Sequence, residues 1–116
     1  SGKYKRGAAP PEGSRLAEWK DTMARLGQER SYDLLETLAK VAKRKEASSA
    51  GVALAWLLAK KEVSSIILGA RTIAQLDDNL SAASIKLTPE DVKELDEASA
   101  PDWAYPYSFI GRMQPW

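Results

Sequence analysis

Neither cysteine nor histidine occurs among the 116 residues of the chain. Without cysteine the protein has no disulfide framework and no thiolate chemistry, which fits an intracellular location, and we expect a cytoplasmic one. Without histidine it lacks the usual general base near pH 7, every Ser-His-Asp or Cys-His arrangement and the ligand of most zinc sites. Since the remaining carboxylates and amines are expected to be solvated surface charges, the sequence predicts neither a catalytic residue nor a metal site.

A large net charge and long apolar runs are also absent. The formal net charge is +1, so there is no general electrostatic attraction to nucleic acid or to an acidic membrane surface. The basic runs within residues 3–6 and 43–45 are too short to alter this expectation. The longest apolar stretch, residues 52–59, is far too short to span a bilayer, and the first residues do not read as a signal peptide. We therefore expect no nucleic-acid and no membrane partner.

The first half of the chain reads as a loop followed by helices. Glycine and proline punctuate residues 1–30, which we interpret as loop. Apolar residues recur at helical spacing within residues 31–60, where two helices are expected. Ser48 lies between them and can cap the second helix.

Residues 63–68 are the one convincing strand. They are short, β-branched and followed by Gly69, and their apolar end suits a strand buried on both faces of a parallel sheet. A single strand cannot form a sheet, and its unpaired backbone groups are costly to bury. Either partner strands come from a missing N-terminal region, or the chain assembles with other copies. The predicted fold class is α/β with about one strand among helices. A complete eight-fold barrel needs about 250 residues, so this chain is not a complete barrel.

Two capped helices follow the strand. The pattern Thr72-x-x-Gln75 predicts a capping box at the start of a helix over 72–82. The inner stripe of this helix is expected to hold Ile73, Leu76 and Leu80. Threonine, proline and two acids in succession predict the start of the last helix, 88–99, and residues 100–116 form an irregular aromatic tail.

The turn between the strand and helix 72–82 is the segment that carries chemistry. A helix N-terminus offers unpaired N–H groups and a partial positive charge. Arg71 adds a planar charged fork suited to a phosphate monoester, and Gly69 leaves the backbone open to a ligand. One helix face carries polar groups that could bond an adenine edge: Gln75, Asp78 and Asn79. The alternative is a capped surface helix whose polar side chains are only solvated.

Six segments follow a more specific pattern: Gly2–Tyr4, Pro10–Arg15, Val52–Leu58, Ile67–Thr72, Gln75–Leu80 and Leu87–Glu90. In this order they closely resemble the C-terminal third of the aldo-keto reductases. The resemblance is to the branch that includes the potassium-channel β subunits and many bacterial reductases, and it covers essentially the whole chain. The most specific part is Gly-Ala-Arg followed by Gln-Leu-x-x-Asn, between residues 69 and 79.

This resemblance implies the C-terminal portion of a (β/α)₈ TIM barrel that binds NADP(H). It places Gly69 and Arg71 at the ribose 2′-phosphate, with Gln75 beside them. The other contacts it implies are Asp78 and Asn79 at the adenine, Lys3 at the pyrophosphate, and Arg15 folded over the cofactor. Asp78 stands where the family more usually has glutamate, so its shorter side chain reaches the adenine less well.

The family reduces carbonyls with a tyrosine proton donor, a lysine, an aspartate and a histidine, all of which precede the region covered here. We therefore expect the C-terminal cofactor-binding part of an NADPH-dependent reductase of aldehydes or ketones, inactive by itself. A carbonyl substrate would bind only with the missing N-terminal region. The alternative is a non-catalytic nucleotide-binding or protein-interaction module. In that case the exposed sheet edge would pair with another chain, including a second copy of this one.

Overall fold

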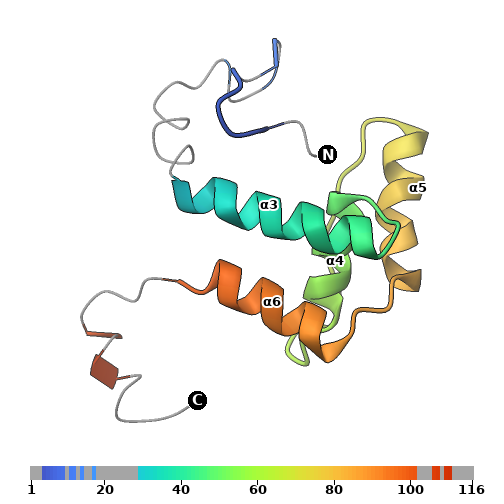
Figure 1. Cartoon of the computed structure of the whole chain (residues 1–116). Coiled ribbons are helices and arrows are strands. Elements are labelled where there is room, and N and C mark those ends of the chain that lie inside the picture. The colour runs from blue at the N-terminus through green and yellow to red at the C-terminus, as the bar shows by residue number, and fades with distance from the viewer. Residues whose placement is uncertain are drawn as a thin grey trace.

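The computed structural model describes residues 4–9, 11–12, 14, 17, 29–101, 106–107 and 109–110. Its elements, in chain order, are α3 (Glu29–Arg44), α4 (Ser49–Leu58), α5 (Ile73–Ser81), the 3₁₀ turn η1 (Ala82–Ser84) and α6 (Pro89–Ser99). Helices α3 and α6 lie side by side and run in opposite directions (Figure 1). Helix α4 packs where α3 ends, and α5 packs on the outer side of α4. No described helix is long and apolar enough to cross a membrane.

Three of these helices begin where side chains cap the first turn. The hydroxyl of Ser48 accepts a hydrogen bond from the N–H three residues later, at 2.9 Å. Thr72 Oγ1 accepts from the N–H of Gln75 at 3.2 Å. Thr88 Oγ1 accepts from the N–H of Asp91, whose carboxylate accepts in return from the N–H of Thr88 at 2.8 Å. These contacts confirm the caps predicted at all three positions, because each cap satisfies an N–H that has no partner within its helix.

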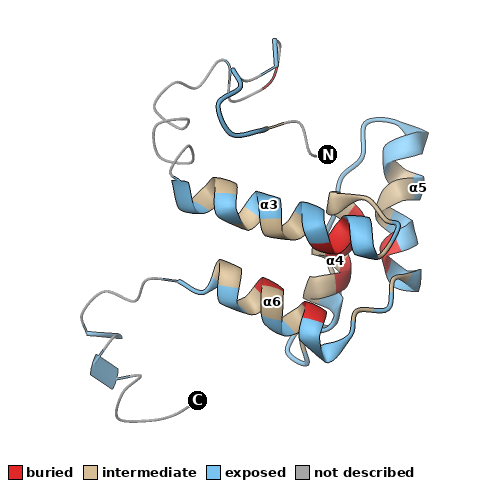
Figure 2. Ribbon diagram, in the orientation of Figure 1, coloured by how far each residue is buried: buried red, intermediate tan, exposed pale blue. Residues whose placement is uncertain are grey.

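The buried core lies where α3, α4 and α6 meet. Val41 and Val52 are fully buried, and Ala42 and Leu95 complete the cluster. Figure 2 shows these buried residues in red on the facing surfaces of the three helices. Helix α5 has no buried residue, so the helix expected to bind the cofactor packs on the outside of this core.

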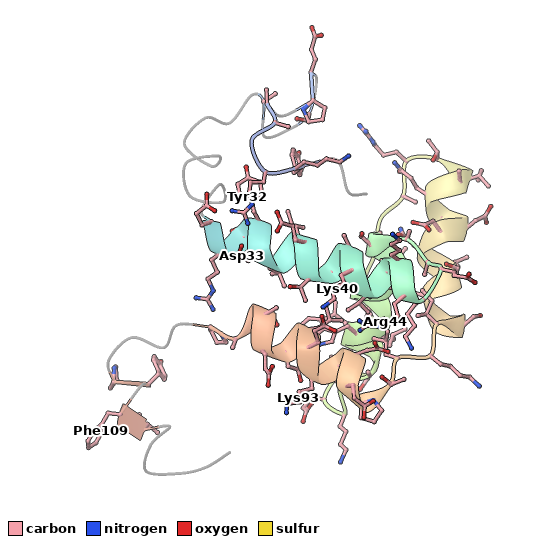
Figure 3. All side chains as sticks on the ribbon, in the orientation of Figure 1. Tyr32, Asp33, Lys40, Arg44, Lys93 and Phe109 are labelled. Carbon is pink, nitrogen blue, oxygen red and sulfur yellow. The ribbon has the colours of Figure 1, made fainter. Side chains whose placement is uncertain are left out.

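An ion-pair network joins the end of α3 to the start of α6. Arg44 Nη2 lies 2.6 Å from Asp91 Oδ1 and 2.8 Å from Glu94 Oε2. Lys45 Nζ lies 2.6 Å from Asp91 Oδ2, and Lys40 Nζ lies 3.1 Å from Glu94 Oε1. Figure 3 shows Lys40 and Arg44 on the side of α3 that faces α6. The network therefore fixes the antiparallel pairing of the two helices.

Asp91 is the buried member of this network, with 2% of its surface exposed. Burial by itself would raise the pKa of the Asp91 carboxyl. Hydrogen bonds from Lys45, the Thr88 backbone and Arg44 outweigh burial and hold that pKa well below its usual range. The carboxylate is thus charged in the folded protein, with donors on both of its oxygens.

The strand predicted at 63–68 is absent, and this part of the prediction is wrong. Residues 65–70 have no regular secondary structure, and the described part of the chain holds no β-strand. Ile67 is fully exposed and Leu68 is 38% exposed. A strand needs a hydrogen-bonded neighbour, and among the described residues no other strand pairs with this segment. The described residues therefore form a helical assembly and do not themselves show the predicted α/β class.

The inner stripe predicted for α5 is also wrong. Ile73 is 74% exposed and Leu80 is 59% exposed, while Leu76 is half-buried. Helix α5 contacts α4 and η1 instead, and no described element packs over the face that carries Ile73 and Leu80. The missing strand and the exposed stripe have the same physical cause, since both segments lack the partners that their apolar side chains require.

The ends of the chain are described only in part. Of the predicted loop 1–30, the structure describes residues 4–9, 11–12, 14, 17, 29 and 30, the last two already in α3. Of the predicted tail 100–116, it describes 100–101, 106–107 and 109–110. Phe109 lies away from the helical core in Figure 3 and is 56% exposed.

Candidate functional site

The turn from residue 69 into α5 presents an open backbone beside a cation. Gly69 is exposed, and a Cβ built on it would meet no atom within 4 Å. The packing of the described residues therefore does not require glycine here, and the open space is available to a ligand. Arg71 is also exposed, at the residue before the N-cap of α5.

Gln75 fixes the backbone of this turn. Its Oε1 accepts a hydrogen bond from the N–H of Arg71 at 2.9 Å. The capping-box pattern suggested that Gln75 would bond the N–H of Thr72, but its side chain reaches one residue further back. The first backbone hydrogen bond of the helix runs from the N–H of Leu76 to the carbonyl of Thr72. The N–H groups of Ile73 and Ala74 therefore have no acceptor within the helix. Arg71, whose backbone N–H is held by Gln75, thus stands next to two backbone donors at the positive end of a helix.

Asp78 and Asn79 point to different neighbours. Asn79 Nδ2 donates to the carbonyl of Gly69 over 3.5 Å, a long contact that links the second turn of α5 back to the entry turn. Asp78 Oδ2 accepts from the hydroxyl of Ser48 at 2.9 Å, so this carboxylate faces the start of α4. Sequence spacing put both side chains on one face of the helix. The structure brings Asn79 toward Gly69 and turns Asp78 toward α4.

Ser48 contacts a predicted site residue, Asp78, although the sequence did not indicate Ser48 as part of the candidate site. Its position before α4 predicted a helix cap, which the structure confirms. Its contact with Asp78 joins residues 30 positions apart, and no local pattern reports such a contact. Lys3 and Arg15, the other two predicted cofactor-binding residues, lie outside the described residues.

Clefts lined by described residues lie on both sides of the start of α4. One, of about 490 Å³, lies beside the Ser48–Asp78 contact, between residues 45–48 and the end of α5. The other, of about 510 Å³, lies between residues 4–6 and helices α3 and α4. The first of these clefts is lined by Asp78, a predicted site residue.

Arg6 holds the N-terminal segment on α3. Its Nη2 lies 2.6 Å from Asp33 Oδ1, its Nε lies 2.9 Å from Glu36 Oε1, and it also pairs with Glu29. The guanidinium carbon lies 5.6 Å from the centroid of the Tyr32 ring. Figure 3 shows Tyr32 and Asp33 at the end of α3 that faces this segment. Arg6 lies shortly after Lys3, the residue predicted to contact the pyrophosphate. Its ion pairs therefore hold this part of the chain against α3.

The described residues offer no metal centre, since they hold no group of three or more histidine, cysteine, aspartate or glutamate side chains that could ligate an ion. The carboxyls with a lowered pKa, Asp91, Glu94 and Asp96, belong to ion pairs between helices. They do not lie at the start of α5. The groups that the start of α5 offers to a ligand are the exposed Arg71, the open Gly69 backbone and the N–H groups of the first turn.

The sequence is similar to known proteins over most of the chain. The profile of the Aldo/keto reductase family matches residues 1–100. The chain is 37% identical over 103 residues to a Schizosaccharomyces pombe protein named as a voltage-gated potassium channel β subunit, covering 84% of this chain and 29% of that protein. It is 42% identical over 64 residues to the aldo-keto reductase ausK of Aspergillus calidoustus, covering 55% and 16%.

A third relative is a Saccharomyces cerevisiae protein, YFL057C, that is named as an aryl-alcohol dehydrogenase; it is 39% identical over 77 residues, with 66% of this chain and 51% of that protein covered. The chain thus spans between 16% and 51% of the length of these three relatives. The family match extends over most of the chain and includes the turn at residue 69 and all of α5. The chain belongs to the aldo/keto reductase family.

Proposed function

We propose that this chain is the C-terminal, cofactor-binding part of an NADPH-dependent oxidoreductase that reduces aldehydes or ketones to alcohols. Family membership supports the reaction class, and the aryl-alcohol dehydrogenase among its relatives supports interconversion of carbonyl and alcohol. The observation that carries the cofactor assignment is the turn at Gly69 and Arg71, held by Gln75 at the start of a capped helix. The absence of cysteine supports a cytoplasmic location.

The residues of this turn fit the 2′-phosphate of NADP(H). Gly69 leaves room for the ribose, and Arg71 supplies a permanently charged fork for the phosphate oxygens. The N–H groups of Ile73 and Ala74, which have no acceptor within α5, add donors at the positive end of the helix. A hydrogen bond to a charged group contributes about 1.5–3 kcal/mol, so the phosphate should raise affinity by at least tenfold.

The rest of the nucleotide would be held by polar groups spread along the chain. Asp78 and Asn79 would face the adenine, with Gln75 beside the phosphate. Lys3 would contact the pyrophosphate, and Arg15 would fold over the bound nucleotide. When bound, NADPH supplies the hydride for carbonyl reduction, and the residues of this chain bind and orient it.

The chain is proposed to be inactive by itself. The tyrosine, lysine, aspartate and histidine of the family's reaction precede the region to which this chain corresponds, and the chain contains no histidine. A carbonyl substrate would therefore bind only when the preceding region is present. The expected result is that the purified chain oxidises no NADPH with any aldehyde or ketone.

Competition between adenosine nucleotides tests the phosphate assignment. Adenosine 2′,5′-bisphosphate should bind the full chain at least tenfold more tightly than adenosine 5′-monophosphate, as measured by isothermal titration calorimetry. Equal affinities would contradict the proposed role of the turn at Gly69 and Arg71, because the two ligands differ only in the phosphate that this turn would hold.

A non-catalytic interaction module is the second candidate, and one observation favours it. Large apolar side chains are exposed along one part of the chain: Leu58, Ile67, Leu68, Ile73 and Leu80. Such a surface supports pairing with another chain, including a second copy. Mixing the chain with the N-terminal portion of a family member separates the two candidates. Recovered NADPH-dependent reductase activity supports the enzyme part, and binding without activity supports the module.

A further inference from the structure

The hydroxyl of Ser48 serves two partners at once. Its oxygen accepts a hydrogen bond from the N–H of Gly51 at 2.9 Å, and it donates its own proton to Asp78 Oδ2 at 2.9 Å. An ionised carboxylate has no proton to give, so the hydroxyl must be the donor in the second bond. Helix α4 is therefore capped by the same group that contacts α5.

The surrounding packing restrains this contact. A Cβ on Gly51 would lie 3.0 Å from Ile85 Cδ1, 3.2 Å from Ser48 Oγ and 3.8 Å from the carbonyl oxygen of Asp78. The start of α4 thus lies directly against the second half of α5 and the segment that follows η1. Asp78 is half-buried, whereas Ile73, at the start of the same helix, is largely exposed. The Ser48–Asp78 bond is consequently one of the contacts that restrain how α5 is turned about its own axis.

The second oxygen of the carboxylate remains available. Asp78 Oδ2 is engaged by Ser48, and no hydrogen bond reaches Oδ1 from the part of the chain that is described. The neighbouring Asn79 contacts the Gly69 carbonyl only over 3.5 Å. A turn of α5 would therefore move Asp78 Oδ1 and the Asn79 amide together.

We propose that Ser48 is a positioning residue of the nucleotide site. Its proton holds Asp78 Oδ2 against α4, which leaves Oδ1 to accept a hydrogen bond from an exocyclic amino group such as that of adenine. This inference rests on the proposed function, since it assumes that a nucleotide lies along α5. It adds a specificity-determining contact that acts through Asp78, and Ser48 itself touches no ligand.

Variants of Ser48 separate its role as the cap of α4 from its role as the donor to Asp78. Ser48→Ala removes both the cap and the donor. Aspartate keeps a good helix cap but has no proton to donate, and it repels Asp78. Threonine keeps both tasks and should behave as wild type. The matched control is Thr88→Ala, which removes a cap of comparable kind from α6, where the Thr88 hydroxyl bonds Asp91 rather than α5.

Discrimination between purine bases is the readout. Dissociation constants for the full chain are measured by fluorescence for NADPH and for its hypoxanthine analogue, in which a carbonyl oxygen replaces the adenine amino group. Asp78 Oδ1 can accept from the amino group and would be repelled by the carbonyl oxygen. Wild type, Ser48→Thr and Thr88→Ala should prefer NADPH by about tenfold. Ser48→Ala and Ser48→Asp should reduce this preference to within about twofold.

The result that overturns the inference is an unchanged preference in Ser48→Ala and Ser48→Asp. A loss of affinity that is equal for both nucleotides would do the same, because it would make Ser48 a purely structural cap. The proposed function has its own readout in the same assay. If wild type binds NADPH and NADH equally, or neither, the proposed function fails and this inference falls with it. If NADPH is preferred over NADH but Ser48 has no effect on base preference, only this inference fails.

Discussion

The indole N–H of Trp56 on α4 donates to Asp96 Oδ1 on α6, with the nitrogen and the oxygen 2.6 Å apart. Lys60 forms an ion pair with the same oxygen, and its Nζ lies 4.8 Å from the centroid of the Trp56 ring. The hydrogen bond from Lys60 lowers the pKa of Asp96, burial opposes this, and the bond from Trp56 lowers it further. One carboxylate therefore joins the end of α4 to α6.

The first prediction concerns this junction. Trp56→Phe should lower the free energy of unfolding by about 1–2 kcal/mol, because it removes the donor and leaves a half-buried carboxylate with one partner fewer. Urea denaturation followed by circular dichroism measures the change. Asp96→Asn is the companion variant, since it keeps an oxygen acceptor for the indole while it removes the charge. An unchanged midpoint in Trp56→Phe would show that the 2.6 Å contact adds nothing to stability.

The second prediction is a loss of stability in acid. Since folding lowers the pKa of Asp91, its stabilising contribution is fully present above the unfolded pKa of about 3.9. That contribution is lost progressively as the pH falls through and below this value toward the folded pKa. Unfolding free energies measured from pH 7 to pH 2 should fall in this window, and Asp91→Asn should flatten that part of the curve. An equally steep decline in Asp91→Asn would assign the acid sensitivity to other carboxyls.

The third prediction concerns the close approach of α4 to Ile85. Gly51→Ala would place a Cβ 3.0 Å from Ile85 Cδ1 and 3.2 Å from Ser48 Oγ. Overpacking costs about 1–3 kcal/mol, which exceeds the roughly 1 kcal/mol that alanine gains over glycine in a helix. We expect a net destabilisation of about 1 kcal/mol. Thermal melting of the double variant with Ile85→Val, which removes Cδ1, should show partial recovery. Stabilisation by Gly51→Ala alone would contradict the packing described here.

The fourth prediction is self-association through the exposed apolar residues. Ile67 is fully exposed and Ile73 is 74% exposed, so the chain should form oligomers at micromolar concentration. Ile67→Lys should shift sedimentation toward the monomer. Ser64→Lys, which adds the same charge at another exposed position of this segment, is the matched control. A monomer at every concentration, in wild type and both variants, would rule out this surface as an interface.

The features predicted correctly from the sequence are those that depend on nearby residues. The caps at Ser48, Thr72 and Thr88 follow from hydroxyls that bond N–H groups three residues later, and such contacts are visible as short patterns. The strand at 63–68 was predicted wrongly because a strand needs a neighbour from elsewhere, which no local pattern supplies.

The same distinction holds within the candidate site. The site at Gly69 and Arg71 was predicted from its own residues and stays a prediction, while the structure adds that the Gly69 backbone is open. The Ser48–Asp78 contact was not predicted, because it depends on how α4 and α5 pack. Gln75 reaches the N–H of Arg71 rather than that of Thr72, a difference of one residue that sequence spacing does not resolve.

The fifth prediction, and the most direct test of the account, is a fluorescence titration of the full chain with NADPH and NADH, alongside Arg71→Ala. Arg71 is exposed at the entry to α5, and its backbone N–H is held by Gln75. We predict that wild type binds NADPH at least tenfold more tightly than NADH, and that Arg71→Ala removes most of this difference while leaving NADH affinity unchanged. Equal affinities of wild type for the two nucleotides, or a preference that survives in Arg71→Ala, would contradict the assignment of this turn to the 2′-phosphate.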